Sequence, residues 1–321
     1  MLKITKESFS MEYQRLLEEF LLELKLQNYS KRTLETYRLH HKKFIDFFTK
    51  EIGSPIIITD VLKVHYKMFI SGLLDSELKT TYINAILKSH KSFWSYLVNE
   101  QVVKENVMTS IKLLKEDRKI LTTFNDDEVK KMLDYWGFDN YISARNKCII
   151  ALLVDTGIRV SELIGIKEED VTEKYIRIFG KGNKWRVVAI SSELSYFLTR
   201  YKRIRDSYFY TIRNRNGKKR VVDEQLFVGK TGKRLETVST IQQIVLETGK
   251  NVGVREVVRC SPHTFRHYWT IKNLENGQDL FTISKLLGHS KLDTTKIYIS
   301  SITSEQLVDK ALETNPLSSI L

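Results

Sequence analysis

The spacing of its apolar residues constrains this chain most, because that spacing is helical almost without a break from Glu7 to about Val103. Leu16, Phe20 and Leu24, with the leucines beside the first two, form one helical stripe. Three more amphipathic segments follow, the last from about Lys79 to Asn99. Amphipathic helices bury their apolar faces by packing on one another. The sequence therefore predicts a compact N-terminal bundle of four helices.

Polar residues mark the ends of these segments. Ser30 is placed to cap the second helix, Gly53-Ser54-Pro55 ends it, and Asp60 is placed to cap the third. A charged stretch without apolar periodicity, residues 112–121, is typical of a linker. The predicted domains are therefore an N-terminal helical domain, a linker and a C-terminal domain, at residues 1–111, 112–121 and 122–321.

The second half mixes helices with a few strands. Asn125 and the acidic residues after it begin a helix, and a long apolar helix covers about Ile142 to Asp155. Two strands, Tyr175–Phe179 and Trp185–Ile190, are joined by a basic tip and read as a hairpin. A further short strand is expected at Gln225–Val228, with helices in the rest. The predicted fold class is mainly α with a small β-sheet (α+β).

Charge suggests a polyanionic partner. The chain has 321 residues, with 52 Lys and Arg against 39 Asp and Glu, a formal net charge of +13. DNA would relieve this self-repulsion by counterion release, although an ordinary basic protein is an equal alternative. The two cysteines, Cys148 and Cys260, indicate no disulfide framework. With no signal peptide or membrane span in sight, a soluble, cytoplasmic, prokaryotic protein without a membrane partner is expected.

Several familiar motifs fail on inspection. Gly229-Lys230-Thr231 resembles the end of a phosphate-binding loop, but Glu224 replaces its leading glycine. His263 and His267 have the spacing of some zinc ligands, but Thr264 stands where a zinc protease needs glutamate. No acidic or cysteine cluster has the spacing of metal ligands, so a metal-dependent nuclease is disfavoured and no metal is expected.

Polar residues that could carry chemistry remain in the second half: Arg159, Glu162, Lys181, His263, Arg266, His289 and Tyr298. Arg159 follows a turn at Gly157, with Glu162 one helical turn later, and Lys181 lies at the hairpin tip. Taken singly, each has an ordinary explanation: Arg159 can pair with Glu162, and Tyr298 can be a core aromatic. Their order and spacing together favour a shared function.

In this order the motifs resemble the tyrosine recombinase (phage integrase-like) family, and its Xer type most closely. TGIRVSELIGI resembles the first arginine box, GKGNKWRVV the lysine hairpin, and HTFRH the His-x-x-Arg-His box. ENGQDLFTISKLLGHSKLDTTKIYI resembles the segment that ends at the nucleophile, and NYSKRTLETYRLHHKKFIDFF the start of the helical DNA-binding domain. The resemblance covers most of the chain. It implies a SAM-like core-binding domain followed by a tyrosine recombinase catalytic domain.

The resemblance implies a role for each polar residue: the nucleophile Tyr298, the phosphate-binding Arg159 and Arg266, the general acid Lys181, the assisting His263 and His289, and the supporting Glu162. Guanidinium groups offer planar, two-pronged donation to the charge that develops on a phosphate under attack. Two of them can replace the metal ions of other nucleases. Positive charge favours the phenolate, and His263 is placed to help remove its proton. The phosphotyrosine bond keeps the energy of the broken bond, so no cofactor is expected.

The family resemblance also implies an assembly. It implies a 3′-phosphotyrosyl bond and strand exchange in a homotetramer on two double-stranded DNA sites, a dimer on each site. The tail after Tyr298 is amphipathic and either docks on a neighbouring subunit, which the resemblance favours, or packs on its own domain: Ile302, Leu307, Val308, Ala311 and Leu312. Integration, excision and resolution are all open, as is an accessory protein.

The two domains are expected to clamp the duplex. Candidate contacts of the first domain to the DNA backbone are Lys31, Arg32, Arg38, Lys42, Lys79, Lys88 and Lys91. The basic segment Arg200–Arg220 is either a further DNA contact or a solvated helix end and loop. Trp185, Tyr268 and Trp269 depart from the family pattern.

Two alternative functions stay open from the sequence. A type IB topoisomerase would use the same chemistry to relax one strand without partners, although the small helical first domain and the amphipathic tail argue against it. A DNA-binding regulator that does not cleave has no need of Tyr298 or Lys181.

Overall fold

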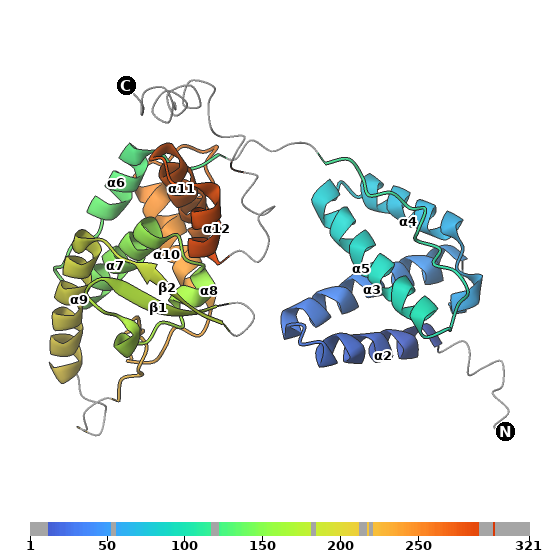
Figure 1. Ribbon diagram of the computed structural model, residues 1–321, viewed down its shortest axis with the longest axis horizontal. Coiled ribbons are helices and arrows are strands. Elements are labelled where there is room, and N and C mark those ends of the chain that lie inside the picture. The colour runs from blue at the N-terminus through green and yellow to red at the C-terminus, as the bar shows by residue number, and fades with distance from the viewer. Residues whose placement is uncertain are drawn as a thin grey trace, which may run out of the picture. The chain divides into compact units, whose positions relative to one another are not determined.

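The chain forms two compact units, Met1–Arg118 and Lys119–Leu321, each with its own hydrophobic core (Figure 1). The computed structural model describes residues 12–52, 56–116, 122–180, 184–211, 217, 221–288 and 298. Over these residues it is mainly helical with one two-stranded sheet, which confirms the predicted fold class. No helix in the described ranges is both long and apolar enough to cross a membrane.

The first unit is the predicted helical bundle. Its four helices are α2 (Glu12–Leu26), α3 (Lys31–Ile52), α4 (Lys63–Asp75) and α5 (Thr80–Asn99), with a short 3₁₀ turn, η1 (Ile58–Asp60), before α4. α5 packs against each of the other three and supplies the fully buried Phe93, Trp94 and Leu97. The stripe predicted for the first helix is confirmed, since Leu16, Phe20 and Leu24 are all buried.

One predicted helix start is right and another is wrong. Ser30 caps α3, because its hydroxyl accepts a hydrogen bond from the backbone N–H of Thr33 at 3.2 Å. Asp60 does not cap α4; it lies in η1, and α4 begins three residues later. The reason is the burial of Val61, which is only 1% exposed and anchors the segment before the helix can start. The imidazole of His65 instead accepts from the N–H of Leu62 at 3.1 Å.

The second unit surrounds one buried helix. Its elements are α6 (Asp126–Asp134), α7 (Tyr141–Thr156), α8 (Val160–Leu163), η2 (Glu168–Asp170), β1 (Tyr175–Gly180), β2 (Lys184–Ala189), α9 (Ser192–Thr211), α10 (Val238–Asn251), α11 (Pro262–Glu275) and α12 (Leu280–Leu287). α6, α9, α10 and α11 all pack on α7, which is buried along most of its length (Figure 1). α7 is therefore the scaffold on which the elements of the second half are placed.

The predicted hairpin is confirmed, but the predicted strand at Gln225–Val228 is wrong. β1 and β2 pair antiparallel, with Phe179 opposite Trp185. Residues 225–228 make only isolated bridges, from Gln225 to Lys167 and from Val228 to Arg234. Residues 226 to 228 are all buried, so buried and exposed side chains do not alternate as they do in a strand with one solvated face. Backbone carbonyls that would accept hydrogen bonds from a neighbouring strand accept them from side chains instead. The carbonyl of Val228, for example, accepts from the hydroxyl of Tyr141 at 2.8 Å.

The basic segment after Arg200 is the end of a helix where it is described. Residues 200–211 continue α9, and residues 212–216 and 218–220 lie outside the described residues. Arg205, one of its cations, is buried and forms an ion pair with Glu168. It also donates to the carbonyls of Asp223 and Gln225, at 3.3 and 3.2 Å. Arg205 therefore contributes to the core, which neither sequence interpretation predicted. Arg200 and Arg203 are exposed on the same helix, as expected for a solvated helix end.

Candidate active site

The glycine turn after α7 positions both predicted phosphate-binding arginines. Gly157 adopts a left-handed conformation, φ +57°, which ends α7 and leads into Arg159 and α8. Its carbonyl accepts a hydrogen bond from Nη1 of Arg266 at 2.8 Å. Trp269 covers the glycine so closely that an added Cβ would lie 2.9 Å from its ring, and its indole N–H donates to the carbonyl of Asp155. The departure from the family pattern at Trp269 thus fills the space beside the turn.

Glu162 lies between two guanidinium groups. Its carboxylate accepts from the backbone N–H and Nη1 of Arg159, at 2.8 and 3.0 Å. Arg186 donates to both carboxylate oxygens, at 2.7 and 2.9 Å. Burial alone raises the pKa of Glu162, but the hydrogen bonds and charges of Arg186 and Arg159 outweigh it and hold the pKa below its usual value. The carboxylate is therefore ionised at neutral pH, as the supporting role predicted for it would require.

The carboxyl end of α12 gathers three guanidinium groups. Arg159 and Arg266 both donate to the carbonyl of Leu287, at 3.3 and 2.8 Å. Arg186 donates to the carbonyl of Leu286 at 3.1 Å, and Arg159 also donates to that of Gly288 at 3.3 Å. The carboxyl end of a helix carries partial negative charge and unsatisfied carbonyls, so it attracts cations. Three cations and one carboxylate thus meet where α8, α12 and the β1–β2 hairpin adjoin (Figure 1).

Arg266 is the most buried cation of this cluster. Burial lowers its pKa to about 10, with repulsion from Arg159 as a further cause. A guanidinium with a pKa of about 10 still carries its charge at neutral pH, so Arg266 stays cationic. Its position one turn into α11 follows from the start of that helix, where Ser261 accepts from the N–H of Thr264 at 3.3 Å.

His263 lies on the first turn of α11 and is exposed. Burial of part of its ring and the charges of Arg266 and Arg159 lower its pKa. It is therefore neutral at pH 7 and able to accept a proton. Its ring centroid is 6.4 Å from that of His267, one helical turn further along the same face.

Tyr298 is 3% exposed and packs with Leu274, Ile283 and Leu287 in a small core beside α11 and α12. Its hydroxyl forms a 2.6 Å hydrogen bond with Nδ1 of His267. Burial raises the pKa of Tyr298, and a hydrogen bond with Thr270 and the charge of Arg266 offset this only in part. The nearby positive charge expected to favour the phenolate is thus outweighed in the DNA-free chain.

Two residues of this site were not predicted from the sequence. His267, rather than His263, contacts the hydroxyl of Tyr298, although both belong to the same motif and lie four residues apart. Arg186 carries its own signal, because it lies on the buried face of β2 two residues before Val188, where strand alternation predicts an apolar side chain. A cation at such a position indicates a buried partner.

Lys181 and His289 lie outside the described residues, and so does the amphipathic tail after Tyr298. The structure brings Arg159, Glu162 and Arg266 together, with His263 next to them. Among the described residues, no group of three or more His, Cys, Asp or Glu side chains is arranged to hold a metal ion.

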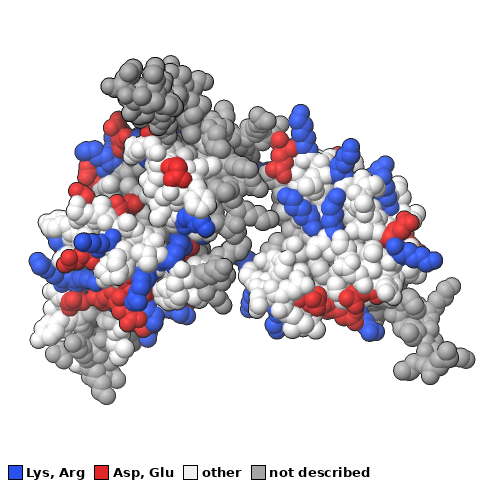
Figure 2. Space-filling view, in the orientation of Figure 1, with Lys and Arg blue, Asp and Glu red and all other residues white. Residues whose placement is uncertain are grey.

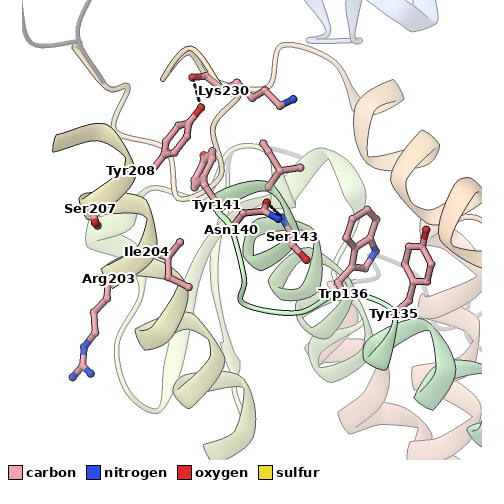
Figure 3. Close-up of a pocket in the computed structure, with 11 residues that line it drawn as sticks. Tyr135, Trp136, Asn140, Tyr141, Ser143, Arg203, Ile204, Ser207, Tyr208 and Lys230 are labelled. Carbon is pink, nitrogen blue, oxygen red and sulfur yellow. Dashed lines mark hydrogen bonds between the residues drawn. The ribbon is translucent and has the colours of Figure 1, made fainter. Parts of the chain in front are cut away.

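A cleft of about 1100 Å³ lies elsewhere in the second unit, between the start of α7 and the second half of α9 (Figure 3). Tyr135, Trp136 and Tyr208 contribute to its walls, and the hydroxyl of Tyr208 donates to the carbonyl of Lys230 at 3.4 Å. None of the predicted catalytic residues lines it. The candidate chemistry is therefore at the arginine cluster and not in this cleft.

The candidate DNA-contacting cations of the first unit divide into two groups. Arg38 and Lys42 are engaged in ion pairs with Glu18 and Asp46, both at 2.6 Å, and Lys31 lies 4.0 Å from Glu35. The other four have no acidic partner among the described residues: Arg32, Lys79, Lys88 and Lys91. On the face of this unit that Figure 2 shows, Lys and Arg gather over the upper part and Asp and Glu along the lower edge. The unpaired cations are the stronger candidates for contacts to phosphate.

Comparison with known proteins gives a consistent family. The model of the phage integrase family matches residues 122–305. The tyrosine recombinase XerC of Thermodesulfovibrio yellowstonii is 34% identical over 309 residues, which are 93% of this chain and 95% of the relative. The tyrosine recombinase XerD of Oceanobacillus iheyensis is 29% identical over 297 residues, covering 91% of this chain and 95% of the relative.

Solved structures share the fold at lower identity. The XerH site-specific recombinase in a post-cleavage complex with palindromic difH substrate has a TM-score of 0.69 and 22% identity, covering 95% of this chain and 84% of its own. A lambda integrase dimer bound to a COC′ core site has a TM-score of 0.67 and 16% identity, covering 87% and 95%. These likenesses support the fold described above.

Proposed function

This chain belongs to the phage integrase family of tyrosine recombinases, and from that premise we propose that Tyr298 is the nucleophile with which it cuts DNA. The chain is an enzyme of site-specific recombination, which cleaves and rejoins DNA strands. The reported relatives are recombinases, and none of them is a topoisomerase that relaxes single strands or a non-cleaving regulator.

The proposed reaction needs a nucleophile, an acid and a place for charge. The phenol oxygen of Tyr298 attacks the scissile phosphorus, a 3′-phosphotyrosyl bond forms, and the 5′-oxygen of the next nucleotide leaves. Arg159 and Arg266 donate to the non-bridging oxygens, where negative charge grows in the transition state. Lys181 protonates the leaving oxygen. Rejoining reverses these steps with a 5′-hydroxyl as the nucleophile, so neither ATP nor a metal ion enters the cycle.

The observation that carries this proposal is the shared acceptor of the two arginines. Arg159 and Arg266 both donate to the carbonyl of Leu287, at 3.3 and 2.8 Å, so their donors converge on one point. A phosphate oxygen carries more negative charge than a carbonyl oxygen and is the better acceptor for two guanidiniums. The cluster holds three guanidiniums against the single carboxylate of Glu162, which leaves positive charge available to a phosphate.

Tyr298 must change its position before it reacts. At 3% exposure, with its hydroxyl bonded to His267, the phenol oxygen is closed to a phosphate on a duplex. Burial and the charges of His263 and Arg266 lower the pKa of His267, so its ring is neutral and suited to hold a neutral phenol. We infer that DNA binding releases this hydrogen bond and brings Tyr298 to the phosphate, with His263 and His289 assisting proton transfer.

Duplex DNA and further copies of the chain are the proposed partners. Lambda integrase has been solved as a dimer on a core site and as a tetramer on a Holliday junction. By analogy, four copies act on two sites, the tail after Tyr298 docks on a neighbouring copy, and the first unit contacts the DNA backbone. Whether an accessory protein takes part is a separate question, which the adduct assay below addresses because it contains the chain alone.

Covalent trapping tests the proposal without knowledge of the DNA site. A pool of nicked duplexes with randomised arms is incubated with the protein in the presence of EDTA, and covalent adducts are isolated under denaturing conditions. The wild type is expected to yield adducts whose peptide link maps to Tyr298, whereas Tyr298→Phe yields none. Adducts that persist in Tyr298→Phe, or that map to another residue, overturn the proposal. Sequencing of the recovered DNA then defines the site.

A further inference from the structure

The cleft between α7 and α9 is lined by aromatic rings whose polar atoms are bound elsewhere in the protein (Figure 3). Tyr141, at the start of α7, is buried and stacks on Tyr208 of α9, with ring centroids 4.5 Å apart. Its hydroxyl donates to the carbonyl of Val228 at 2.8 Å. The indole N–H of Trp136 donates to a threonine hydroxyl of α10 at 2.9 Å. The rings are thus held in place, which lowers the entropic cost of binding a ligand against them.

The charge of the lining has one sign. Among the described residues, two cations line the cleft, Arg203 on α9 and Lys230 in the loop before α10, and no Asp or Glu does. Two acidic residues adjoin the lining in the sequence but point elsewhere. The carboxylate of Asp139 lies against the Cα of Gly137, and that of Asp206 lies 3.9 Å from the buried arginine beside it in α9. α7 also begins at the cleft, and the amino end of a helix carries partial positive charge.

A buried arginine behind the aromatic floor adds charge that no carboxylate compensates. Arg145, one turn after Tyr141 on α7, is 7% exposed. Its guanidinium donates to the same carbonyl of Val228 at 3.1 Å and to the side-chain oxygen of Asn146 at 2.9 and 3.2 Å, and within the described ranges it has no acidic partner. Burial lowers the pKa of Arg145, but an arginine stays charged at neutral pH. A charge in a protein interior is screened less than one in water, so Arg145 favours an anion in the cleft.

The cleft lies at the end of α7 opposite to the arginine cluster. α7 has 16 residues, so its axis is about 24 Å long. Tyr141 begins the helix at the cleft, whereas Gly157 ends it beside Arg266. The cleft is therefore distinct from the proposed phosphate site, and a ligand in it can be bound at the same time as DNA.

The size and the few cations of the cleft favour a peptide over nucleic acid. Nucleic acids are bound through many phosphate contacts along the backbone, whereas two cations line this cleft. A volume of about 1100 Å³ holds a short segment of several side chains, and aromatic walls in a hollow are typical anchor sites of protein interfaces. Positive charge beside apolar rings complements a segment that carries both carboxylates and an apolar side chain.

We propose that this cleft binds an acidic segment of a partner protein, in which Asp or Glu side chains flank an aromatic or large aliphatic residue. The apolar residue packs between Trp136 and Tyr208, and the carboxylates lie against Lys230 and the amino end of α7. This binding goes beyond the proposed function and does not depend on it, because no residue of the arginine cluster lines the cleft. Adducts at Tyr298 and peptide binding in the cleft are separate readouts, so each proposal can fail alone.

Selection from a random peptide library tests the chemistry of the occupant. Dodecapeptides displayed on phage are selected on the full-length protein and counter-selected on Ser207→Trp, in which an indole at an exposed position of α9 fills the cleft. The surviving peptides are expected to be enriched in Asp and Glu next to aromatic or aliphatic residues. A synthetic copy of a survivor, the probe, is expected to bind with a Kd of about 1–100 μM by fluorescence anisotropy, and about tenfold more weakly to Lys230→Glu.

Lys202→Glu is the matched control, because it makes the same change of charge on α9 outside the lining of the cleft. Its affinity for the probe is expected to stay within about twofold of the wild type. A probe whose acidic residues are replaced by lysine is expected to prefer Lys230→Glu to the wild type, because reversal on both sides restores the attraction.

Four results overturn the inference. Survivors without acidic residues remove the charge complementarity. Equal weakening by Lys202→Glu and Lys230→Glu assigns binding to the net charge of +13. A fall in the duplex affinity of a Tyr298→Phe protein when Ser207→Trp is added assigns the cleft to nucleic acid. Displacement of the probe by a synthetic peptide of residues 299–321, which also carry acidic and apolar side chains, assigns the cleft to this chain's own carboxy-terminal residues.

Discussion

At the scale of single residues, Glu162 decides how the arginine cluster is arranged. Its buried carboxylate is shared unequally, because Arg186 occupies both oxygens while Arg159 reaches one of them through Nη1. Nη2 of Arg159 is left to the weaker acceptor at Gly288, 3.3 Å away. Arg186 thus neutralises the carboxylate that would otherwise bind Arg159 alone. The proposed phosphate ligand keeps a donor for DNA as a result.

Loss of Arg186 is expected to affect both stability and adduct formation. Arg186→Gln leaves the Glu162 carboxylate, 3% exposed, with a single cation, and breaking a buried ion pair from one side costs about 3–5 kcal/mol. Adduct formation on the recovered DNA is expected to slow about a hundredfold, because Arg159 is drawn toward Glu162. Urea unfolding and single-turnover trapping measure the two effects.

A double variant and an exposed control separate the effect of the unpaired carboxylate from that of losing any arginine. The double variant Glu162→Gln/Arg186→Gln removes the unpaired charge, so it is expected to be more stable than Arg186→Gln alone. Arg203→Gln, at an exposed position on α9, is the control and is expected to match the wild type. Unchanged stability and rate in Arg186→Gln contradict the role given to this residue.

The position of Tyr298 predicts a low chemical reactivity in the absence of DNA. Nitration attacks the phenolate, so burial and the raised pKa of Tyr298 both protect it. In the DNA-free protein we expect Tyr298 to be nitrated at least ten times more slowly than Tyr196 and Tyr210, which are 57% and 74% exposed. Peptide mass spectrometry gives all three rates from one sample. A Tyr298 that reacts as fast as Tyr210 contradicts the buried position.

At the scale of elements, the contact between α7 and α11 places the arginines. Gly157 ends α7, its carbonyl holds Arg266, and Trp269 of α11 lies against its Cα. Gly157→Ala meets two penalties, about 1–2 kcal/mol for the left-handed backbone and a further 1–3 kcal/mol for contact with the Trp269 ring. A fall of the free energy of unfolding by about 2–5 kcal/mol is expected, together with slower adduct formation.

Gly253 separates the two penalties. It also has a positive φ, +73°, but an added Cβ there meets nothing within 4 Å. Gly253→Ala therefore carries the backbone penalty alone and is expected to keep normal adduct formation. Equal destabilisation by both substitutions, measured by denaturant unfolding, shows that Trp269 does not constrain the turn.

The sequence predicts elements better than it predicts the contacts between them. Local signals predict where α3 begins, at the Ser30 cap, and where α7 ends, at Gly157. The alternation of apolar and polar residues predicts the hairpin. Asp60 misled because Val61 is buried before the helix begins, which is a tertiary effect. The arginines converge on the carboxyl end of α12, which lies more than a hundred residues from Arg159 in the sequence. No local sequence pattern predicts a contact between residues so far apart. The family motifs predicted that Arg159 and Arg266 act together only because the resemblance is to proteins that share this fold.

At the scale of the whole molecule, the two units bury different kinds of titratable group. The core of the first unit contains His40, His41 and His90, all at most 2% exposed, with the rings of His41 and His90 4.0 Å apart. Their hydrogen-bond partners are phenols, a hydroxyl and a carbonyl, such as Tyr13 for His41 and Tyr66 for His90. The core of the second unit relies on ionised carboxylates, and Arg255 holds the pKa of Glu128 at about 2.

These differences predict that acid destabilises the first unit before the second. Burial lowers the pKa of His90 to about 3 and that of His41 well below its usual value. Above the unfolded pKa of about 6.5 both states are neutral, so stability is fully present; below it the unfolded chain binds protons that the folded core rejects. Each histidine then removes roughly 2 kcal/mol by pH 5. The paired carboxylates of the second unit are lost only as the pH falls below about 4.5, because their folded pKa values are depressed.

Calorimetry of the full chain between pH 7.5 and 5 tests this order, because each unit has its own core and melts with its own transition. His41→Phe removes one titrating ring, so it identifies the transition of the first unit and flattens its pH dependence by about one proton. The first unit carries the proposed backbone contacts, so acid should weaken DNA binding while the arginine cluster is still intact. Two transitions that shift together with pH, or a His41→Phe protein with the wild-type slope, contradict the assignment of acid sensitivity to this buried cluster.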